Sequence, residues 1–359
     1  MTIDSPSSTR KSERLRCDAS NPRVSVVMGA YNGERFLRPA IESILNQTFS
    51  DFELIVIDDC STDSTPRILG EFKDDRMRVV FNERNLGIAE MTNQGIAAAR
   101  GEYIALQDHD DLSWPTRFEC QVAFLNSHPQ VGMVGSNCNV MDEAGTLVPH
   151  WPVEYEDENL KWDLLWRCPF FHTSVMLRRS AIQEVGGYSS DPKYRFAEDY
   201  EFMSRVALRH AVANIPKLLG CWRMHKTSAS HLNVSQQAAA VRSISQKNIC
   251  HVLGWDRIDP VSWEGVERFL YHPVGQPLDL TSAEVNRTLD FLALIHDAFC
   301  SKYGLGNREA AAHRRRVFWP WAKHALALSY RRNGRRDAAC RFSLFVQGAK
   351  LVARTMRPA

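Results

Sequence analysis

Residues 53–63 read ELIVIDDCSTD, and this stretch decides the fold. Its apolar run, Leu54–Ile57, is unbroken by polar residues, as in a strand buried on both faces of a parallel sheet. A helical pattern at Phe36–Leu45 precedes it, with Pro39 tolerable only in the first turn. Apolar runs of similar length recur, separated by helical patterns, at Val24–Met28, Met77–Phe81, Tyr103–Leu106 and Val131–Val134. The alternation predicts an α/β domain with a mostly parallel sheet covered by helices on both sides.

Carboxylates gather directly after two of these runs, at the predicted carboxyl ends of strands, where ligands bind in such sheets. Asp58 and Asp59 follow Leu54–Ile57. Because adjacent like charges repel, the pair indicates a binding role, such as accepting hydrogen bonds from a base or a ribose. Asp63 is interpreted instead as a cap of the next helix.

A second acidic group, Asp108-His109-Asp110-Asp111, follows Tyr103–Leu106. In an extended segment Asp108 and Asp110 share one face and can bind a single hard cation, while His109 points the other way. Mg²⁺ or Mn²⁺ held by one or two carboxylates usually completes its shell with phosphates, which suggests a nucleoside diphosphate between the two acidic groups. A loop of solvated acids is the alternative.

The spacing alone leaves the roles of two later positions, Asp199 and His225, undecided. Glu198-Asp199 begins a predicted helix over about Ala197–His210. Asp199 is either a favourable first-turn acid or a general base for an acceptor hydroxyl. His225, in Arg223-x-His225, is either a third metal ligand beside a phosphate-binding Arg223 or a surface side chain.

In order and spacing, a set of motifs closely resembles the family 2 glycosyltransferases, which have the Rossmann-like GT-A fold. The resemblance covers about residues 23–231. It implies an inverting transferase that uses a nucleotide-sugar donor and a divalent metal, Mn²⁺ or Mg²⁺. The motifs are VSVVMGAYNG at 24–33, ELIVIDDCSTD at 53–63, Asn85-Leu-Gly, Asp108-His-Asp-Asp, Gly186-Gly-Tyr and Glu198-Asp199.

The resemblance also implies roles for individual residues. The nucleotide would be held by Ala30, Tyr31, Asn32, and Asp58 or Asp59, with Asn85 and Gly87 in the same pocket. Asp108 and Asp110 would form the metal and diphosphate motif, His225 would complete the metal site, and Asp199 would be the general base. Gly29-Ala30 replaces the usual Pro-Thr, and Cys60 stands where Gly is common, so the edge of the nucleotide pocket differs without losing a charge.

Two competing functions are weighed against this one. A nucleotidyltransferase on a similar fold would require a Gly-rich, Lys-containing phosphate loop after the first strand. The segment Gly29–Phe36 has no lysine, which counts against a nucleotidyltransferase. A catalytically silent glycan- or nucleotide-binding module is disfavoured because every expected carboxylate is present.

Three regions are expected along the chain. Residues 1–22 hold few large apolar groups and predict a flexible tail. Residues 23–232 form the GT-A catalytic domain. Residues 233–359 are predicted to form an α-helical appendage with a basic end, in which Thr281-x-x-Glu284 is a capping box that precedes Leu289, Leu292 and Phe299 on one helix face.

The composition, 44% hydrophobic and 24% charged residues in 359, is that of a folded protein. Nine cysteines without a C-x-x-C pair fit a reduced, cytoplasmic protein. No apolar run approaches the roughly 18 residues of a membrane span, and no apolar signal core is expected near the N-terminus.

The basic end, residues 313–359, has twelve Lys and Arg against one acid, although the formal net charge of the chain is only +2. It could contact anionic lipid peripherally at the inner membrane face, or be a solvated helical face. Nucleic acid is not expected as a partner, because the few aromatic residues nearby are expected to pack between helices. The expected acceptor is a glycan or a lipid-linked molecule, as in the synthesis of a cell-surface polysaccharide or glycoconjugate.

Overall fold

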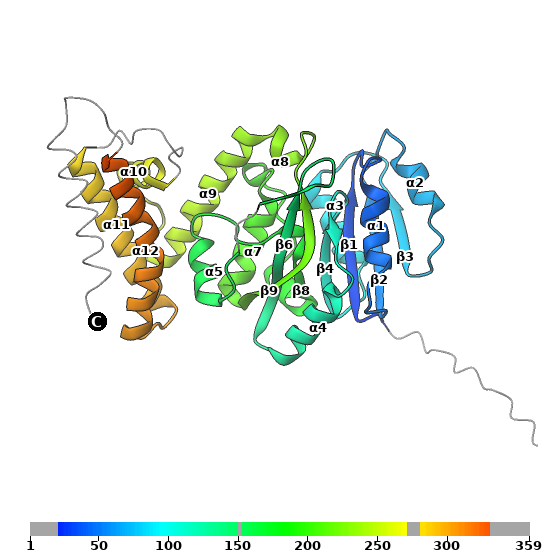
Figure 1. Ribbon diagram of the computed structural model, residues 1–359, viewed down its shortest axis with the longest axis horizontal. Coiled ribbons are helices and arrows are strands. Elements are labelled where there is room, and N and C mark those ends of the chain that lie inside the picture. Colours follow the sequence, from blue (N-terminus) through cyan, green and yellow to red (C-terminus); the bar gives the residue numbers. More distant parts are fainter. Residues whose placement is uncertain (1–20, 150–152, 271–280, 331–359) are drawn as a thin grey trace, which may run out of the picture.

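The computed structural model describes residues 21–149, 153–270 and 281–330. Most of the predicted tail and the basic end beyond residue 330 therefore lie outside the described residues. In the part that is described, a nine-stranded sheet has helices on its faces, and a group of helices formed by α10, α11 and α12 lies at one end (Figure 1).

The strand order is β3-β2-β1-β4-β8-β6-β9-β5, with β7 beside β6. The strands are β1 Val24–Ala30, β2 Phe52–Asp58, β3 Met77–Phe81, β4 Tyr103–Asp108, β5 Leu112–Ser113, β6 Val131–Met141, β7 Leu147–Val148, β8 Met176–Arg178 and β9 Ala211–Arg223. β1 to β4 pair in parallel, as predicted. β8 pairs antiparallel with both β4 and β6, so the sheet as a whole is mixed.

The helices are α1 Leu37–Leu45, α2 Thr65–Glu71, α3 Ile88–Ala98, α4 Arg117–Ser127, α5 Asp157–Asp163, α6 Arg179–Val185, α7 Glu198–Arg209, α8 Ala229–Leu232, α9 Val234–Leu253, α10 Pro260–Leu270, α11 Ser282–Lys302 and α12 Asn307–Tyr330. Two short 3₁₀ turns occur at His172–Ser174 and Pro192–Tyr194. Pro39 is the third residue of α1, where a missing N–H breaks no hydrogen bond within the helix.

The unbroken apolar character of β2 is explained by a core on each face of the sheet. Ile55 and Ile57 belong to one hydrophobic cluster, and Leu54 and Val56 belong to the other. Side chains of a strand alternate between faces, so a strand covered on both sides must be apolar throughout. β3 is different, because it is the edge strand and Phe81 is 54% exposed. The prediction of burial on both faces is wrong for β3.

The C-terminal helices pack on the sheet domain through a third cluster. Leu289, Leu292 and Phe299 of α11 are buried there with Trp162 and Trp166, which belong to α5 and the turn after it. The capping box at Thr281 and Glu284 is confirmed.

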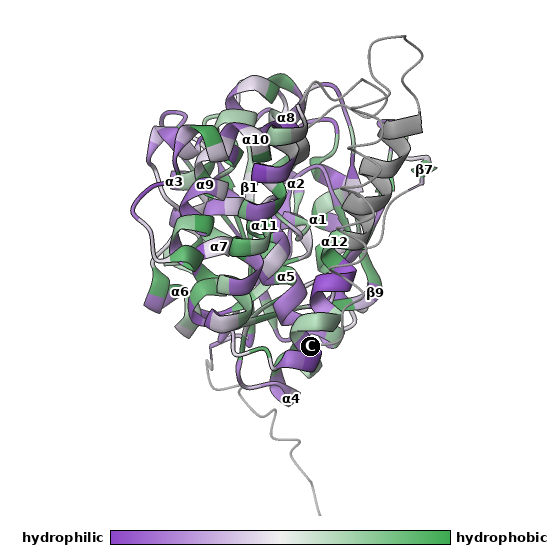
Figure 2. Ribbon diagram, turned by 90° about the vertical axis from the view of Figure 1, so that its left-hand side faces the viewer, coloured by the Kyte–Doolittle hydropathy of each residue, from purple (hydrophilic) through white to green (hydrophobic). Residues whose placement is uncertain are grey.

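Helix α9 links this third cluster to the main core. It contributes Ala240 and Ile244 to the core of the sheet domain and Ile249 and Val252 to the third cluster. Hydrophilic and hydrophobic residues alternate along α9 and α11 (Figure 2). In the described part of the chain, no helix combines the length and the apolar character that crossing a membrane requires.

Candidate active site

The predicted acids meet at one edge of the sheet. Ala30, at the end of β1, is in register with Asp58 of β2, and Gly29 is in register with Asp108 of β4. Because β1 lies between β2 and β4, Asp58 and Asp108 are separated by two strand spacings, about 10 Å. The two acidic groups therefore face the same side of the molecule.

The adjacent carboxylates Asp58 and Asp59 have different surroundings. Asp59 is 1% exposed, and its carboxylate accepts hydrogen bonds from Asn82 Nδ2 (2.8 Å), the Leu86 amide (3.0 Å) and the Gly87 amide (2.8 Å). Asp58 is 2% exposed, and its Oδ1 is buried without a hydrogen-bond partner. Asp59 organises the following loop, whereas one carboxylate oxygen of Asp58 has no partner within the described part of the protein.

The other predicted nucleotide residues line the same edge. Asn85 is exposed, and its Nδ2 donates to the Asp59 carbonyl (3.3 Å). Gly87 has a φ of +86°, a backbone conformation that favours glycine. Ala30 is fully buried, whereas Tyr31 is 45% exposed. Tyr31 is thus the residue of this group with a ring surface available to a base.

Asn32 joins the ends of β1 and β2. Its Oδ1 accepts from the Thr62 amide (2.8 Å), and its own amide donates to Ser61 Oγ (2.9 Å). Cys60, just before this contact, has a φ of +64°, which explains why glycine is favoured at the position. Asp63 accepts from the Thr65 amide at the start of α2 (2.8 Å), in line with its interpretation as a cap.

The second acidic group does not continue as a strand. β4 ends at Asp108, and His109 and Asp110 form a turn, so the two carboxylates do not share the face of an extended segment. Asp110 Oδ2 lies 2.7 Å from His225 Nε2, and Asp108 Oδ1 lies 2.9 Å from His172 Nδ1. His109 points inward and its Nδ1 lies 3.2 Å from the Gly29 carbonyl oxygen, so its ring is structural.

Asp110 and His225 offer the best fit to a divalent cation at this edge. A carboxylate oxygen and an imidazole nitrogen are both suitable ligands, and the His225 side chain is only 6% exposed. Burial by itself raises the pKa of Asp110, but the hydrogen bond from His225 and the nearby imidazoles outweigh burial and lower it. Asp110 is therefore ionised at neutral pH, as a ligand must be. Asp108 faces the same side with a 38% exposed side chain.

His172 connects Asp108 to the region of Asp199. Its Nε2 lies 2.9 Å from the Tyr188 hydroxyl. Burial opposes the charged form, but Asp108 and Asp199 outweigh it and raise the pKa of His172 to about 9. The imidazole is thus protonated at neutral pH, so Nδ1 donates to Asp108 and Nε2 donates to the Tyr188 oxygen.

Asp199 lies in the first turn of α7 and is half-buried. Burial raises its pKa, while the positive His172 and two backbone amides lower it, and burial prevails. A first-turn acid held only by the helix dipole would have a lowered pKa instead. Burial raises the pKa of the neighbouring Glu198 in the same way, so the shift at Asp199 reflects its burial in this turn.

A buried polar network supports the turn from below. Arg117 is fully buried and donates to Gln107 Oε1 (2.9 Å), Ser113 Oγ (2.8 Å) and the Leu106 carbonyl (2.8 Å). Burial lowers the pKa of Arg117 to about 10, so it remains charged at neutral pH. Burial and repulsion by Asp110 raise the pKa of Asp111. The guanidinium supplies positive charge beneath a turn that holds three acids.

Nothing in the spacing of the acids points to His172, Tyr188 or Arg117. Tyr188 directly follows Gly186-Gly187, a motif of the family resemblance, so that motif could have indicated it. His172 lies 64 positions from Asp108, and no local pattern connects the two.

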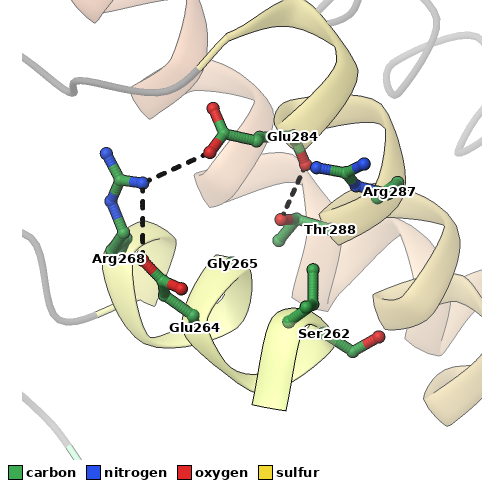
Figure 3. A pocket seen from close by; sticks show the side chains of 8 residues that line it. Ser262, Glu264, Gly265, Arg268, Glu284, Arg287 and Thr288 are labelled. Carbon is green, nitrogen blue, oxygen red and sulfur yellow. Dashed lines mark hydrogen bonds and ion pairs between the residues drawn. The ribbon is translucent and has the colours of Figure 1, made fainter. Parts of the chain in front are cut away.

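A pocket in the C-terminal region does not hold this chemistry. It lies between α10 and α11, where Gly265 and Thr288 form part of its wall (Figure 3). Its two acids are already engaged, since Glu264 and Glu284 pair with Arg268 and Glu284 also closes the capping box. The pocket is a packing gap between helices rather than part of the edge that carries the acids.

Comparison with known proteins identifies the family. The profile described as Glycosyl transferase family 2 matches residues 25–186. A protein of Bacillus subtilis that bears a glycosyltransferase name, EpsE, is 40% identical over 189 residues, which is 52% of this chain and 67% of EpsE. No support arises for a nucleotidyltransferase or a silent module among these relatives.

Two solved structures are similar in fold at 18% identity. The first is TarS from S. aureus, residues 1–349, in complex with UDP-GlcNAc. Its TM-score is 0.54, and the match covers 84% of this chain and 87% of the TarS chain. The second is the mannosyltransferase PcManGT from Pyrobaculum calidifontis, in complex with GDP-Man and Mn²⁺. Its TM-score is 0.50, and the match covers 94% of this chain and 86% of PcManGT. The protein is thus a glycosyltransferase of the GT-A fold. It belongs to glycosyltransferase family 2.

Proposed function

We propose that this glycosyltransferase moves a sugar from a nucleotide-sugar donor to an acceptor hydroxyl, with inversion at the anomeric carbon. The observation that carries the proposal is Asp199, a half-buried carboxyl with a raised pKa in the electrostatic neighbourhood of Asp108. A raised pKa of the carboxyl group lies closer to neutral pH, where the pKa of an effective general base is expected. The complexes of TarS with UDP-GlcNAc and of PcManGT with GDP-Man support the class of donor.

The donor nucleotide would bind at the ends of β1 and β2. Ala30, Tyr31 and Asn32 would line its pocket, and the unpartnered Oδ1 of Asp58 would accept a hydrogen bond from the base or the ribose. Asp59 would hold the loop that carries Asn85 and Gly87 in position. Burying an acceptor without a partner is costly, so a ligand donor at Asp58 would gain affinity from satisfying it.

The chemical step would depend on Asp199. It would take the proton of the acceptor hydroxyl as that oxygen attacks the anomeric carbon opposite the departing nucleoside diphosphate, which inverts the anomer. Protonated His172 would hold Asp108 in place and add positive charge near the leaving group. Asp108, Asp110 and His225 would hold Mn²⁺ or Mg²⁺, which, when bound, offsets negative charge on the diphosphate.

The Asp199→Asn variant tests the base. Its turnover, measured as release of nucleoside diphosphate, should fall by about 10²- to 10⁴-fold, while affinity for the donor should stay near that of the wild type. Asp191→Asn is the matched control, because Asp191 is an acid shortly before α7 that pairs with Lys193. Unchanged turnover in Asp199→Asn would eliminate Asp199 as the base.

A thermal-shift series with UDP, GDP, CDP and dTDP and their sugar conjugates, with and without Mn²⁺ or Mg²⁺, tests the donor. A ligand that binds only the folded state raises the Tm. We expect a metal-dependent shift with one base, which Asp110→Ala should weaken. If no nucleotide shifts the Tm of the wild type, a silent module replaces the transferase as the better proposal.

The proposed acceptor is a glycan or a lipid-linked molecule in the synthesis of a cell-surface polysaccharide or glycoconjugate. The basic end would then contact the inner membrane face peripherally. Two of its arginines are already engaged, because Arg314 pairs with Asp297 and Arg316 with Glu154. The remaining basic residues lie mostly in 331–359, so this segment is the one expected to contact lipid. Vesicles with anionic lipid should bind the full chain in low salt, and removal of residues 331–359 should abolish the binding. Equal binding to neutral vesicles would contradict this role.

A further inference from the structure

Three side chains of the C-terminal helices form a cluster far along the chain from the acidic edge. His296 and Cys300 lie one turn apart on α11, and His313 lies on α12. All three are buried, and one ligand atom from each lies within 4.8 Å of the others. Among the residues that the structure describes, no other three His, Cys, Asp or Glu side chains gather this closely.

We propose that His296, Cys300 and His313 form a zinc site. A tetrahedral Zn²⁺ with bonds of about 2.0–2.1 Å to nitrogen and about 2.3 Å to sulfur separates two nitrogens by about 3.4 Å and a nitrogen from a sulfur by about 3.6 Å. His296 Nε2 lies 3.1 Å from His313 Nδ1 and 3.6 Å from Cys300 Sγ. Cys300 Sγ is equally far, 3.6 Å, from His296 Nδ1, so the three side chains are close enough to share an ion after a rotation of the Cys300 or His296 side chain.

The surroundings of the cluster make a role in metal-free packing costly. The Trp162 ring lies 5.5 Å from that of His296 and 5.4 Å from that of His313, and Phe299 stacks on His313 at 5.3 Å. In this aromatic shell His313 Nε2 is buried without a hydrogen-bond partner. The three side chains contact one another, but the unsatisfied nitrogen of His313 costs free energy in this apolar core unless a rearrangement around a ligand compensates it.

The chemistry of the side chains also suits a metal. Two imidazoles and one thiol are ligand types of zinc sites, and zinc uptake would release the thiol proton because the thiolate is the ligand. Asp297 Oδ1 lies 3.6 Å from His296 Nδ1, and Asp297 also pairs with Arg314. A carboxylate near the second ring nitrogen is the usual support of a zinc-bound histidine.

Such an ion would join α11 to α12 next to Trp162 of α5, at the contact between the helical region and the catalytic domain. This site differs in chemistry from the edge that carries Asp110. A thiolate and two imidazoles select zinc, whereas carboxylates select Mn²⁺ or Mg²⁺. The three side chains leave the fourth position of a tetrahedral ion to a water molecule, and the aromatic wall around the site favours a structural role.

The full chain, purified without a histidine tag, allows a direct test. We expect about one equivalent of zinc by elemental analysis, and Co²⁺ loading should produce the absorption band of a cobalt–thiolate bond. Cys300→Ser should lose that band and weaken zinc binding by at least about 10-fold. Cys250→Ser, which alters a cysteine of α9 outside the cluster, and Asp110→Ala should both keep the band and the zinc affinity.

Wild-type protein that takes up neither metal, or a cobalt–thiolate band that survives in Cys300→Ser, would overturn the proposal. His313→Gln is the second variant, and circular dichroism verifies the fold of each. If both variants fail to fold, added zinc must still raise the Tm of the apo wild type, because a metal that binds only the folded state stabilises it. No zinc-dependent rise in Tm would then also overturn the proposal.

Discussion

Asp58 and Asp59 are neighbours in sequence, and the structure predicts opposite effects when each is changed to asparagine. Asp59 receives hydrogen bonds from Asn82, Leu86 and Gly87. Hydrogen bonds to a charged group contribute about 1.5–3 kcal/mol each, and asparagine keeps an acceptor on only one side of its amide. Asp59→Asn should therefore lower the free energy of unfolding by about 3 kcal/mol.

Asp58→Asn should leave the free energy of unfolding unchanged or higher, because it removes a buried charge whose Oδ1 has no partner. It should instead weaken nucleotide binding by about 10- to 100-fold, the loss of one charge-assisted hydrogen bond. Urea unfolding and nucleotide titration by calorimetry measure the two quantities. The reasoning is refuted if the two variants lose stability equally, or if Asp59→Asn is as stable as the wild type.

Three further predictions concern single residues. Cys60→Gly should raise the free energy of unfolding by about 0.5–1 kcal/mol, because glycine tolerates the φ of +64°; urea unfolding should show no such gain for Cys60→Ala. Arg117→Met should lower the free energy of unfolding by about 3 kcal/mol or more, since Gln107, Ser113 and the Leu106 carbonyl lose a buried donor; a smaller loss in thermal and urea unfolding would contradict this. Burial raises the pKa of Glu53, but hydrogen bonds from Ser25, Arg100 and Arg78 outweigh burial and lower it. The stability that ionised Glu53 contributes is therefore complete above about pH 4.5, and it is lost as the pH falls through the lowered pKa. The stability difference between the wild type and Glu53→Gln should therefore narrow below about pH 4.5, and parallel pH profiles would disprove it.

Local sequence was sufficient where the structure depends on local periodicity. The strand at Leu54–Ile57 is recognisable because its two faces contact two cores and every position must be apolar. β3 lies at the edge of the sheet, and its Arg78, a charged residue in an otherwise apolar run, is the one residue within the strand that indicates incomplete burial. The family motifs identified the edge that carries Asp58 and Asp108, because their order fixes the topology.

The different surroundings of Asp58 and Asp59 could not be predicted from the sequence. The partners of Asp59 lie 23, 27 and 28 positions away, and nothing near Asp58 in the sequence shows that Asp58 lacks such partners. The turn at His109 and Asp110 depends on His225, which is 115 positions from Asp110. Contacts over such separations exist only once the sheet has formed, so local spacing predicts a group of acids but not which acid is free.

The packing of the C-terminal helices has a consequence for how this enzyme can vary between relatives. Trp162, Leu165 and Trp166 belong to the sheet domain, yet α11 and α12 cover them, and α9 supplies Ala240 and Ile244 to the main core. The helical region is therefore not an exchangeable module that could be lost without effect. A relative that ends after its sheet domain must carry polar residues at these positions, or cover them with a different partner.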